Sequence, residues 1–186
     1  MPDSLPFAKR WQRTSWNSFP DWAWQLAAEP SLPGDDRSHS VLAAALSHGT
    51  GEFRIYRIAD PDDDGDVLDP GEVSLVFDRP SGVPGEYPLD RAGYKPQIAP
   101  LVVTEDGVAH REIAVAGLTS PDRVSLVSDS GAVSNIEHAF PNSTDWPANG
   151  LGVVAGPLGE LYSVRAGYTE SGLVWTVYRL EPDGAR

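Results

Sequence analysis

Cysteine is missing from this chain of 186 residues. Its absence excludes disulfides, thiolate nucleophiles, and zinc or iron–sulfur centres held by cysteine. Any metal ion must then be held by aspartate, glutamate, histidine or backbone oxygen.

Basic residues are scarce as well. The sequence has 14 Lys and Arg against 27 Asp and Glu, a formal net charge of −13, and its only lysines are Lys9 and Lys95. Binding to nucleic acid or to an anionic membrane surface depends on Lys and Arg. We therefore expect no direct nucleic-acid contact and no membrane contact. The acidity either serves solubility or attracts a basic protein partner.

Long apolar runs are also lacking. No stretch approaches the roughly 18 residues that a membrane helix needs, and the N-terminal residues lack the apolar core of a signal peptide. These observations predict a cytoplasmic protein without an anchor.

Aromatic residues are concentrated at the N-terminus. Four of the six tryptophans lie there, namely Trp11, Trp16, Trp22 and Trp24. We interpret them either as a cap on the β core or as partner-binding residues. Capping signals predict two short helices in this region. One begins at Ser18 and ends at Pro30, and the other begins near Ser38 and ends at Gly49.

From residue 52 onward, β-forming residues alternate with polar ones. Turn residues separate the runs, most clearly at Asp106-Gly107 and at residues 129–131. The predicted strands are 52–59, 73–78, 98–104, 108–116, 123–128, 132–139, 151–155, 160–168 and 173–180. The last two are expected to pair as a hairpin.

These signals predict a mainly β fold, an antiparallel β-sandwich with a β-barrel as the alternative, carrying the two short N-terminal helices. We expect one compact domain over residues 1–186. Its expected parts are a helical, Trp-rich cap (1–50), a β-hairpin region (51–78), a loop (79–97) and a β-sandwich module (98–180).

The residues 60–72 contain seven acidic side chains and no basic one. Asp60, Asp62 and Asp64 match the DxDxDG pattern of calcium loops, and Val67 matches the apolar eighth position. The candidate metal ligands are Asp60, Asp62, Asp64, Asp66 and Glu72. Glu72 comes one residue later than the closing glutamate of an EF-hand loop, which predicts weak calcium binding, no tighter than ~10⁻⁴–10⁻³ M. The alternative is a solvated acidic turn, with no cofactor at all.

Acid–base candidates are few. His110 and Glu112 are expected on one face of a strand, and His138 lies farther along the chain. We weigh these three as catalytic candidates against ordinary surface or hydrogen-bonded roles.

Nucleophile motifs such as GxSxG and SxxK are absent, and residues 150–156 do not fit a dinucleotide fingerprint. The leading hypothesis is a non-enzymatic recognition or accessory module that contacts another protein through aromatic and acidic surface. The first alternative is an enzyme or ligand binder with a site in a β cavity. The second is an acidic decoy for a protein that handles nucleic acid.

Overall fold

The computed structural model describes residues 22–32, 40–46, 52–62, 64, 67, 69–79, 96–118, 124–136, 152–156, 159–169 and 172–180. Within these residues the chain forms strands and no helix. The first four strands are β1 (Trp22–Ala28), β2 (Val41–Leu46), β3 (Phe53–Ile58) and β4 (Val73–Arg79). The next four are β5 (Gln97–Glu105), β6 (Val108–Ala116), β7 (Val124–Ser128) and β8 (Val133–Ile136). The last three are β9 (Gly152–Ala155), β10 (Leu161–Thr169) and β11 (Gly172–Leu180).

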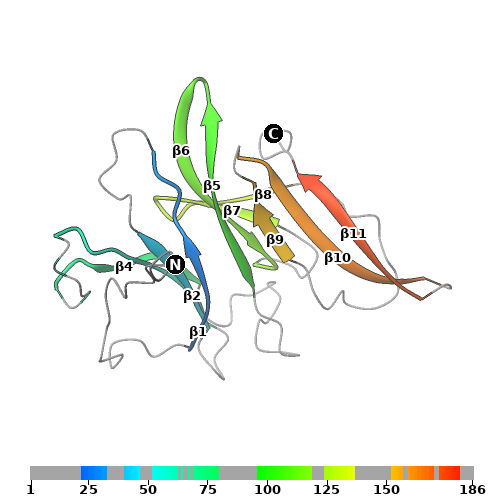
Figure 1. The fold of residues 1–186 in the computed structure, drawn as a ribbon, viewed down its shortest axis with the longest axis horizontal. Helices are drawn as coiled ribbons and strands as arrows, with labels where there is room; N and C mark the ends of the chain where they lie inside the picture. Colours follow the sequence, from blue (N-terminus) through cyan, green and yellow to red (C-terminus); the bar gives the residue numbers. More distant parts are fainter. Residues whose placement is uncertain are drawn as a thin grey trace, which may run out of the picture.

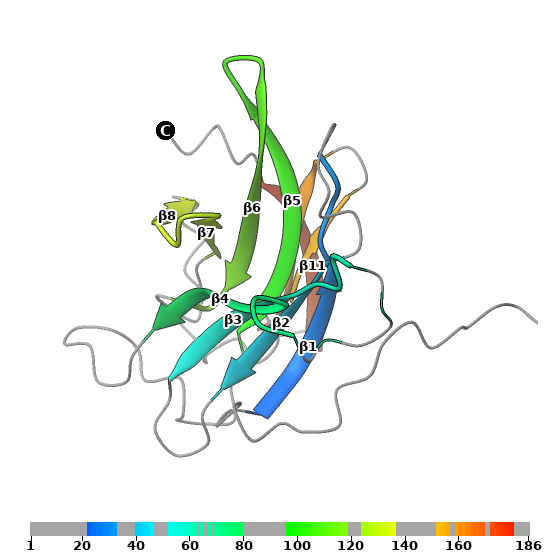
Figure 2. The same ribbon diagram turned by 90° about the vertical axis from the view of Figure 1, so that its left-hand side faces the viewer.

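The strands form three antiparallel sheets, each built from a continuous part of the chain. The N-terminal sheet has the order β1-β2-β3-β4, the middle sheet β5-β6-β7-β8, and the C-terminal sheet β11-β10-β9. The middle sheet lies between the other two, with the β5–β6 hairpin rising above them (Figures 1 and 2). Among the described strands no sheet closes into a barrel, so the barrel alternative finds no support.

The middle sheet is apolar on both faces. One face contributes Leu101, Ala114 and Leu126 to a core shared with the C-terminal sheet. The opposite face contributes Ile113 and Val115 to a second core, shared with the N-terminal sheet. This arrangement follows from the alternation of side chains along a strand, since neighbouring residues point to opposite faces.

Turn chemistry explains two of the hairpins. Asp106 and Gly107 both adopt positive φ, 51° and 78°, as a two-residue turn of the I′ type requires. Gly131 has φ 80° in the turn between β7 and β8, where its N–H donates to the Ser128 carbonyl at 2.9 Å. The predicted pairing of the last two strands is confirmed, with Thr169 opposite Gly172 at the closed end.

The two predicted helices are wrong wherever the structure describes them. Residues 22–28 and 41–46 are strands β1 and β2. Residues 29–30 and 40 are not helical either. The other residues of both predicted helices lie outside the described ranges. In β2 the four central residues are buried, because the strand is covered on both faces. A continuous apolar run of this kind has no strand alternation and looks the same as a buried helix in sequence. Of the predicted 79–97 loop, Arg79 and Gln97 are strand residues and 80–95 lie outside the described ranges.

Side chains tie the N-terminal sheet to the middle one. The Gln25 amide donates to the Ile98 carbonyl and accepts from the Ile98 N–H, both at 2.7 Å. A register shift in β1 between Ala23 and Gln25 accompanies this contact. Gln25 thus bonds both backbone polar groups of Ile98 in β5, which is an edge strand of the middle sheet.

Candidate metal centre

The β3–β4 hairpin holds the acidic segment 60–72. The Ala59 N–H donates to the Glu72 carbonyl at 2.9 Å, which extends the β3–β4 pairing beyond Ile58 and Val73. This bond places Glu72 directly beside the residue that precedes Asp60. The two ends of the acidic segment therefore meet, whatever the spacing between them in the sequence.

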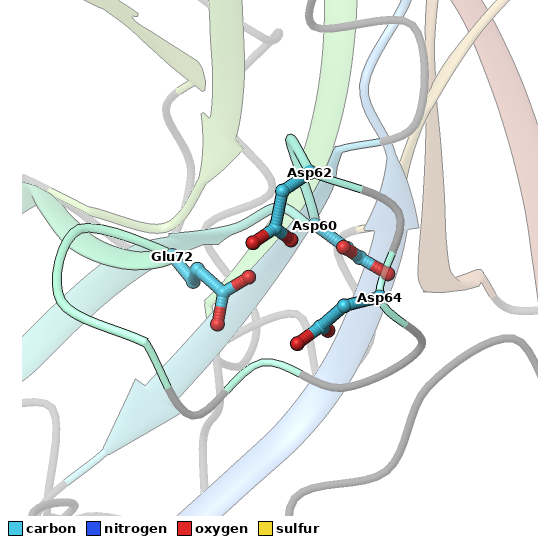
Figure 3. A group of neighbouring side chains, drawn as sticks. All are labelled: Asp60, Asp62, Asp64 and Glu72. Carbon is cyan, nitrogen blue, oxygen red and sulfur yellow. The ribbon is translucent and has the colours of Figure 1, made fainter.

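Four carboxylates converge inside this hairpin, those of Asp60, Asp62, Asp64 and Glu72. One oxygen from each lies within 4.8 Å of the corresponding oxygen of every other. Figure 3 shows the four side chains pointing toward a common centre. Ligands on opposite sides of a calcium ion are ~4.6–5.2 Å apart, since each Ca–O distance is ~2.3–2.6 Å. The spacing is therefore compatible with one ion bound by all four groups.

Glu72 is the unusual member of this group, because only 3% of its surface is exposed. Its Oε2 accepts a hydrogen bond from the Asp69 N–H at 2.6 Å. Its Oε1 is buried and has no hydrogen-bond partner among the described residues. A buried carboxylate oxygen without a partner is costly, and a bound cation would remove that cost.

The electrostatics of the loop agree with this geometry. Burial, followed by the charges of Asp62, Asp69 and Asp64, raises the pKa of Glu72, although the hydrogen bond from Asp69 opposes the shift. Desolvation and the neighbouring Asp64 charge raise the pKa of Asp62. Without a cation the carboxylates destabilise one another in their charged forms.

Comparison with family models, with curated proteins and with solved structures finds no match to this chain.

Val67 anchors the loop to the sheet beneath it. Its side chain is 1% exposed and packs with Ala43 of β2 and Ile58 of β3 on the outer face of the N-terminal sheet. A fixed point in the middle of the loop limits the positions that the acidic residues on either side of it can take. The Asp-rich segment is thus folded back onto the sheet.

Of the five candidate metal ligands, the structure brings four together. Glu72 was expected to lie out of register for closing the site, yet its carboxylate joins the cluster. The EF-hand count applies to a loop between helices, whereas here the pairing of Ala59 with Glu72 sets the closing position. Asp66 lies outside the described residues.

The acid–base candidates are brought together only in part. His110 Nε2 lies 3.5 Å from Glu112 Oε1, so the two residues share one face of β6 as predicted. Glu112 is buried, with 7% of its surface exposed. His138 is outside the described residues, so its distance from this pair is not defined.

The tryptophan candidates are mostly undescribed. Trp22 and Trp24 belong to β1, a strand that pairs with β2. The positions of their side chains are not described. Trp11 and Trp16 lie outside the described ranges. Whether these residues cap the core or bind a partner stays a prediction.

Two features were missed by sequence analysis. One is a buried ionic group centred on Glu29, which contacts Arg57 and Arg111. The other is an exposed apolar surface on the C-terminal sheet, which carries Trp175 and Val177. The sequence of β11 places apolar side chains on both faces of the strand, and it does not show which face is covered.

In the described part of the chain there is no helix with the length and apolarity needed to cross a membrane.

Proposed function

We propose that this protein is a non-enzymatic β-sandwich module that binds a calcium ion in its β3–β4 hairpin and recognises another protein through its surface. The observation that carries the calcium proposal is the buried Glu72 Oε1, which lacks a hydrogen-bond partner among the described residues and faces three aspartates. The sandwich assignment is supported by the core that the middle and C-terminal sheets share.

Calcium fits the donor set better than other common ions. All four groups are carboxylates, which suit hard cations, whereas zinc and copper favour sites with imidazole or thiolate. Magnesium demands near-ideal octahedral geometry and keeps several waters, while calcium tolerates irregular sites with six to eight oxygens. Backbone carbonyls and water would complete the shell.

Convergence of Glu72 also changes the expected affinity. The reason for weak binding was a closing carboxylate out of register, and the hairpin removes that reason. We now expect dissociation constants below ~10⁻⁴ M, the lower bound for low-affinity extracellular calcium modules.

Isothermal titration calorimetry with calcium and with magnesium tests this proposal. We expect saturable calcium binding with a stoichiometry near one. Glu72→Gln keeps the shape of the side chain but removes its charge, and it should weaken binding by at least about tenfold. Asp62→Asn/Asp64→Asn should have the same effect. The control is Asp106→Asn, which removes a carboxylate from the exposed tip of the β5–β6 hairpin and should leave the binding isotherm unchanged.

Two results would count against the proposal. One is the absence of saturable binding at millimolar calcium. The other is equal weakening by Glu72→Gln and Asp106→Asn, which would mean that calcium responds only to net charge.

The recognition part of the proposal is supported by a separate observation, the exposed apolar surface of the C-terminal sheet. Large side chains exposed together on one face are typical of interaction sites. The cavity-enzyme alternative, based on His110, Glu112 and His138, and the acidic-decoy alternative find no comparable support in the described residues.

A further inference from the structure

The two faces of the C-terminal sheet differ. Val153, Leu161 and Leu180 point from one face into the core shared with the middle sheet. On the opposite face Val154, Trp175 and Val177 are 58%, 60% and 63% exposed. The register places these residues close together, since Val177 pairs with Val164, and Val154 pairs with Tyr162, two positions along the same strand β10. We call the residues Val154, Tyr162, Val164, Trp175 and Val177 the outer apolar face.

β11 is also the edge of this sheet. Among the described strands it pairs only with β10, and it lies at the outside of the molecule (Figure 1). Natural edge strands are protected from pairing by proline, bulges, short length or several charges. The nine residues Gly172–Leu180 include no proline and one charged residue, Arg179, and their pairing with β10 has no bulge. An edge of this kind is able to pair with another strand.

The distribution of charge is compatible with a second copy of this chain as the partner of β11. The protein carries a net charge of −13, so two copies repel each other over most of their surfaces. The strands β9, β10 and β11 contain no aspartate or glutamate, and their only charged residues are Arg165 and Arg179. Two copies can therefore approach through this sheet without bringing strand carboxylates together.

We propose that β11 pairs with β11 of a second copy of this chain, antiparallel and about a two-fold axis. The sheet would become continuous across both copies, and the outer apolar faces would adjoin. This inference rests on the recognition part of the proposed function and names a second copy as the protein that is recognised. It is independent of the calcium site, because β11 belongs to a different sheet from the β3–β4 hairpin.

Centring the two-fold axis on Thr176 pairs all nine residues of β11. Trp175 then lies opposite Val177 of the second copy, so these two exposed apolar side chains cover each other in both halves of the interface. Arg179 lies opposite Leu173. The two Arg179 positions are separated by six residues along the strand, roughly 20 Å, which is well beyond the ~8 Å screening length at physiological salt.

A single added pair of strands is a small interface. Interfaces below the standard size belong to weak or transient complexes. We therefore expect a concentration-dependent equilibrium between monomer and dimer, with a dissociation constant in the micromolar range.

Cysteine trapping tests the arrangement directly, because the natural chain contains no cysteine. Thr176 is exposed and would face its own copy across the axis, where cross-strand Cβ atoms lie ~4.5–5.5 Å apart. Thr176→Cys should form a disulfide-linked dimer under mild oxidation. The control is Val133→Cys, at an exposed position of the edge strand β8, which should remain mostly monomeric.

Analytical ultracentrifugation provides the second measurement, with EDTA present so that calcium plays no part. The unmodified chain should show a weight-average mass that rises with concentration. Val177→Lys should abolish the rise, whereas Val108→Lys, at the 66% exposed tip of the β5–β6 hairpin, should not. A monomer mass at all concentrations would overturn the proposal, and so would equal trapping of the two cysteine variants or equal loss of association in the two lysine variants.

Discussion

Glu29 shows how much one side chain contributes to the joining of the sheets. Its carboxylate accepts hydrogen bonds from Arg57 at 2.7 and 2.6 Å and from Ser40 at 2.6 Å, and Arg111 lies 3.9 Å away. Only 2% of the Glu29 side chain is exposed. Glu29 directly follows β1 and Ser40 directly precedes β2, while the two arginines belong to β3 and β6. The group therefore links the N-terminal sheet to the middle one.

We predict that Glu29→Gln lowers the free energy of unfolding by about 1–3 kcal/mol, because it removes the buried carboxylate that pairs with Arg57, while Arg57 keeps its ion pair with Asp129. The control is Glu52→Gln. Glu52 pairs with Arg54 at 3.0 Å, but its side chain is 28% exposed, and such pairs contribute less than ~1 kcal/mol. Denaturant titrations of both variants give the comparison. Similar midpoints would mean that the buried group contributes no more than a surface pair.

The pH dependence separates the two acidic sites. Burial by itself would raise the pKa of Glu29, but hydrogen bonds from Arg57 and Ser40 and the charges of Arg57 and Arg111 outweigh it, so the pKa is lowered. Its stabilising contribution is therefore present above the pKa of the unfolded chain and is lost as pH falls through the folded pKa. Asp62 and Glu72 have raised pKa values, so their contribution has the opposite sign and is lost as pH rises.

A cation should offset the loss at Asp62 and Glu72, because it binds their charged forms. We predict that calcium raises the melting temperature more at pH 7 than at pH 4. Thermal denaturation with calcium or with EDTA at both values measures the difference, and in Glu72→Gln the calcium effect at pH 7 should shrink. A calcium effect independent of pH would contradict this prediction.

At the scale of strands and loops, the sequence predicted those elements whose signal is local. Strands β3 to β11 show alternation or apolar runs between turn residues such as Asp106-Gly107, and their positions were predicted to within one or two residues wherever they are described. β1 and β2 were mistaken for helices, because tertiary pairing overrides the helical preference of an alanine-rich run. The clustering of Asp60, Asp62 and Asp64 was predicted from their spacing. The position of Glu72 and the Glu29 group depend on contacts between elements, which no local pattern encodes.

Gly159 gives a prediction for a single connection, the turn between β9 and β10. Its φ is +84°, and a Cβ there would lie 2.8 Å from the Val102 carbonyl oxygen of β5. Gly159→Ala should therefore cost about 1–3 kcal/mol, from backbone strain and from displacement of β5. Gly152→Ala is the control, since its Cβ would meet nothing within 4 Å and its φ is not left-handed. Chemical denaturation should show a lower midpoint for Gly159→Ala only. Equal midpoints for the two variants would show that β5 moves to accommodate the added Cβ at little cost.

At the scale of the whole molecule, the three sheets depend on one another. Removing residues 1–30 would delete β1, the Gln25 contact with Ile98, and Glu29. We predict a large drop in melting temperature and exposure of apolar surface, because losses of this size are comparable with a total stability of ~5–15 kcal/mol. Circular dichroism melting and binding of a hydrophobic dye measure both effects. An unchanged melting temperature would mean that β1 is dispensable.

The burial of the middle sheet on both faces has a consequence during synthesis. The chain makes the three sheets in order, so the N-terminal sheet can cover one apolar face of the middle sheet as soon as β8 has left the ribosome. The other face waits for β9 to β11. At ~5–20 residues per second this wait lasts several seconds. The nascent protein therefore passes through an intermediate with an exposed, aggregation-prone apolar surface. The yield of folded protein should then depend on chaperones and on the speed of translation after β8.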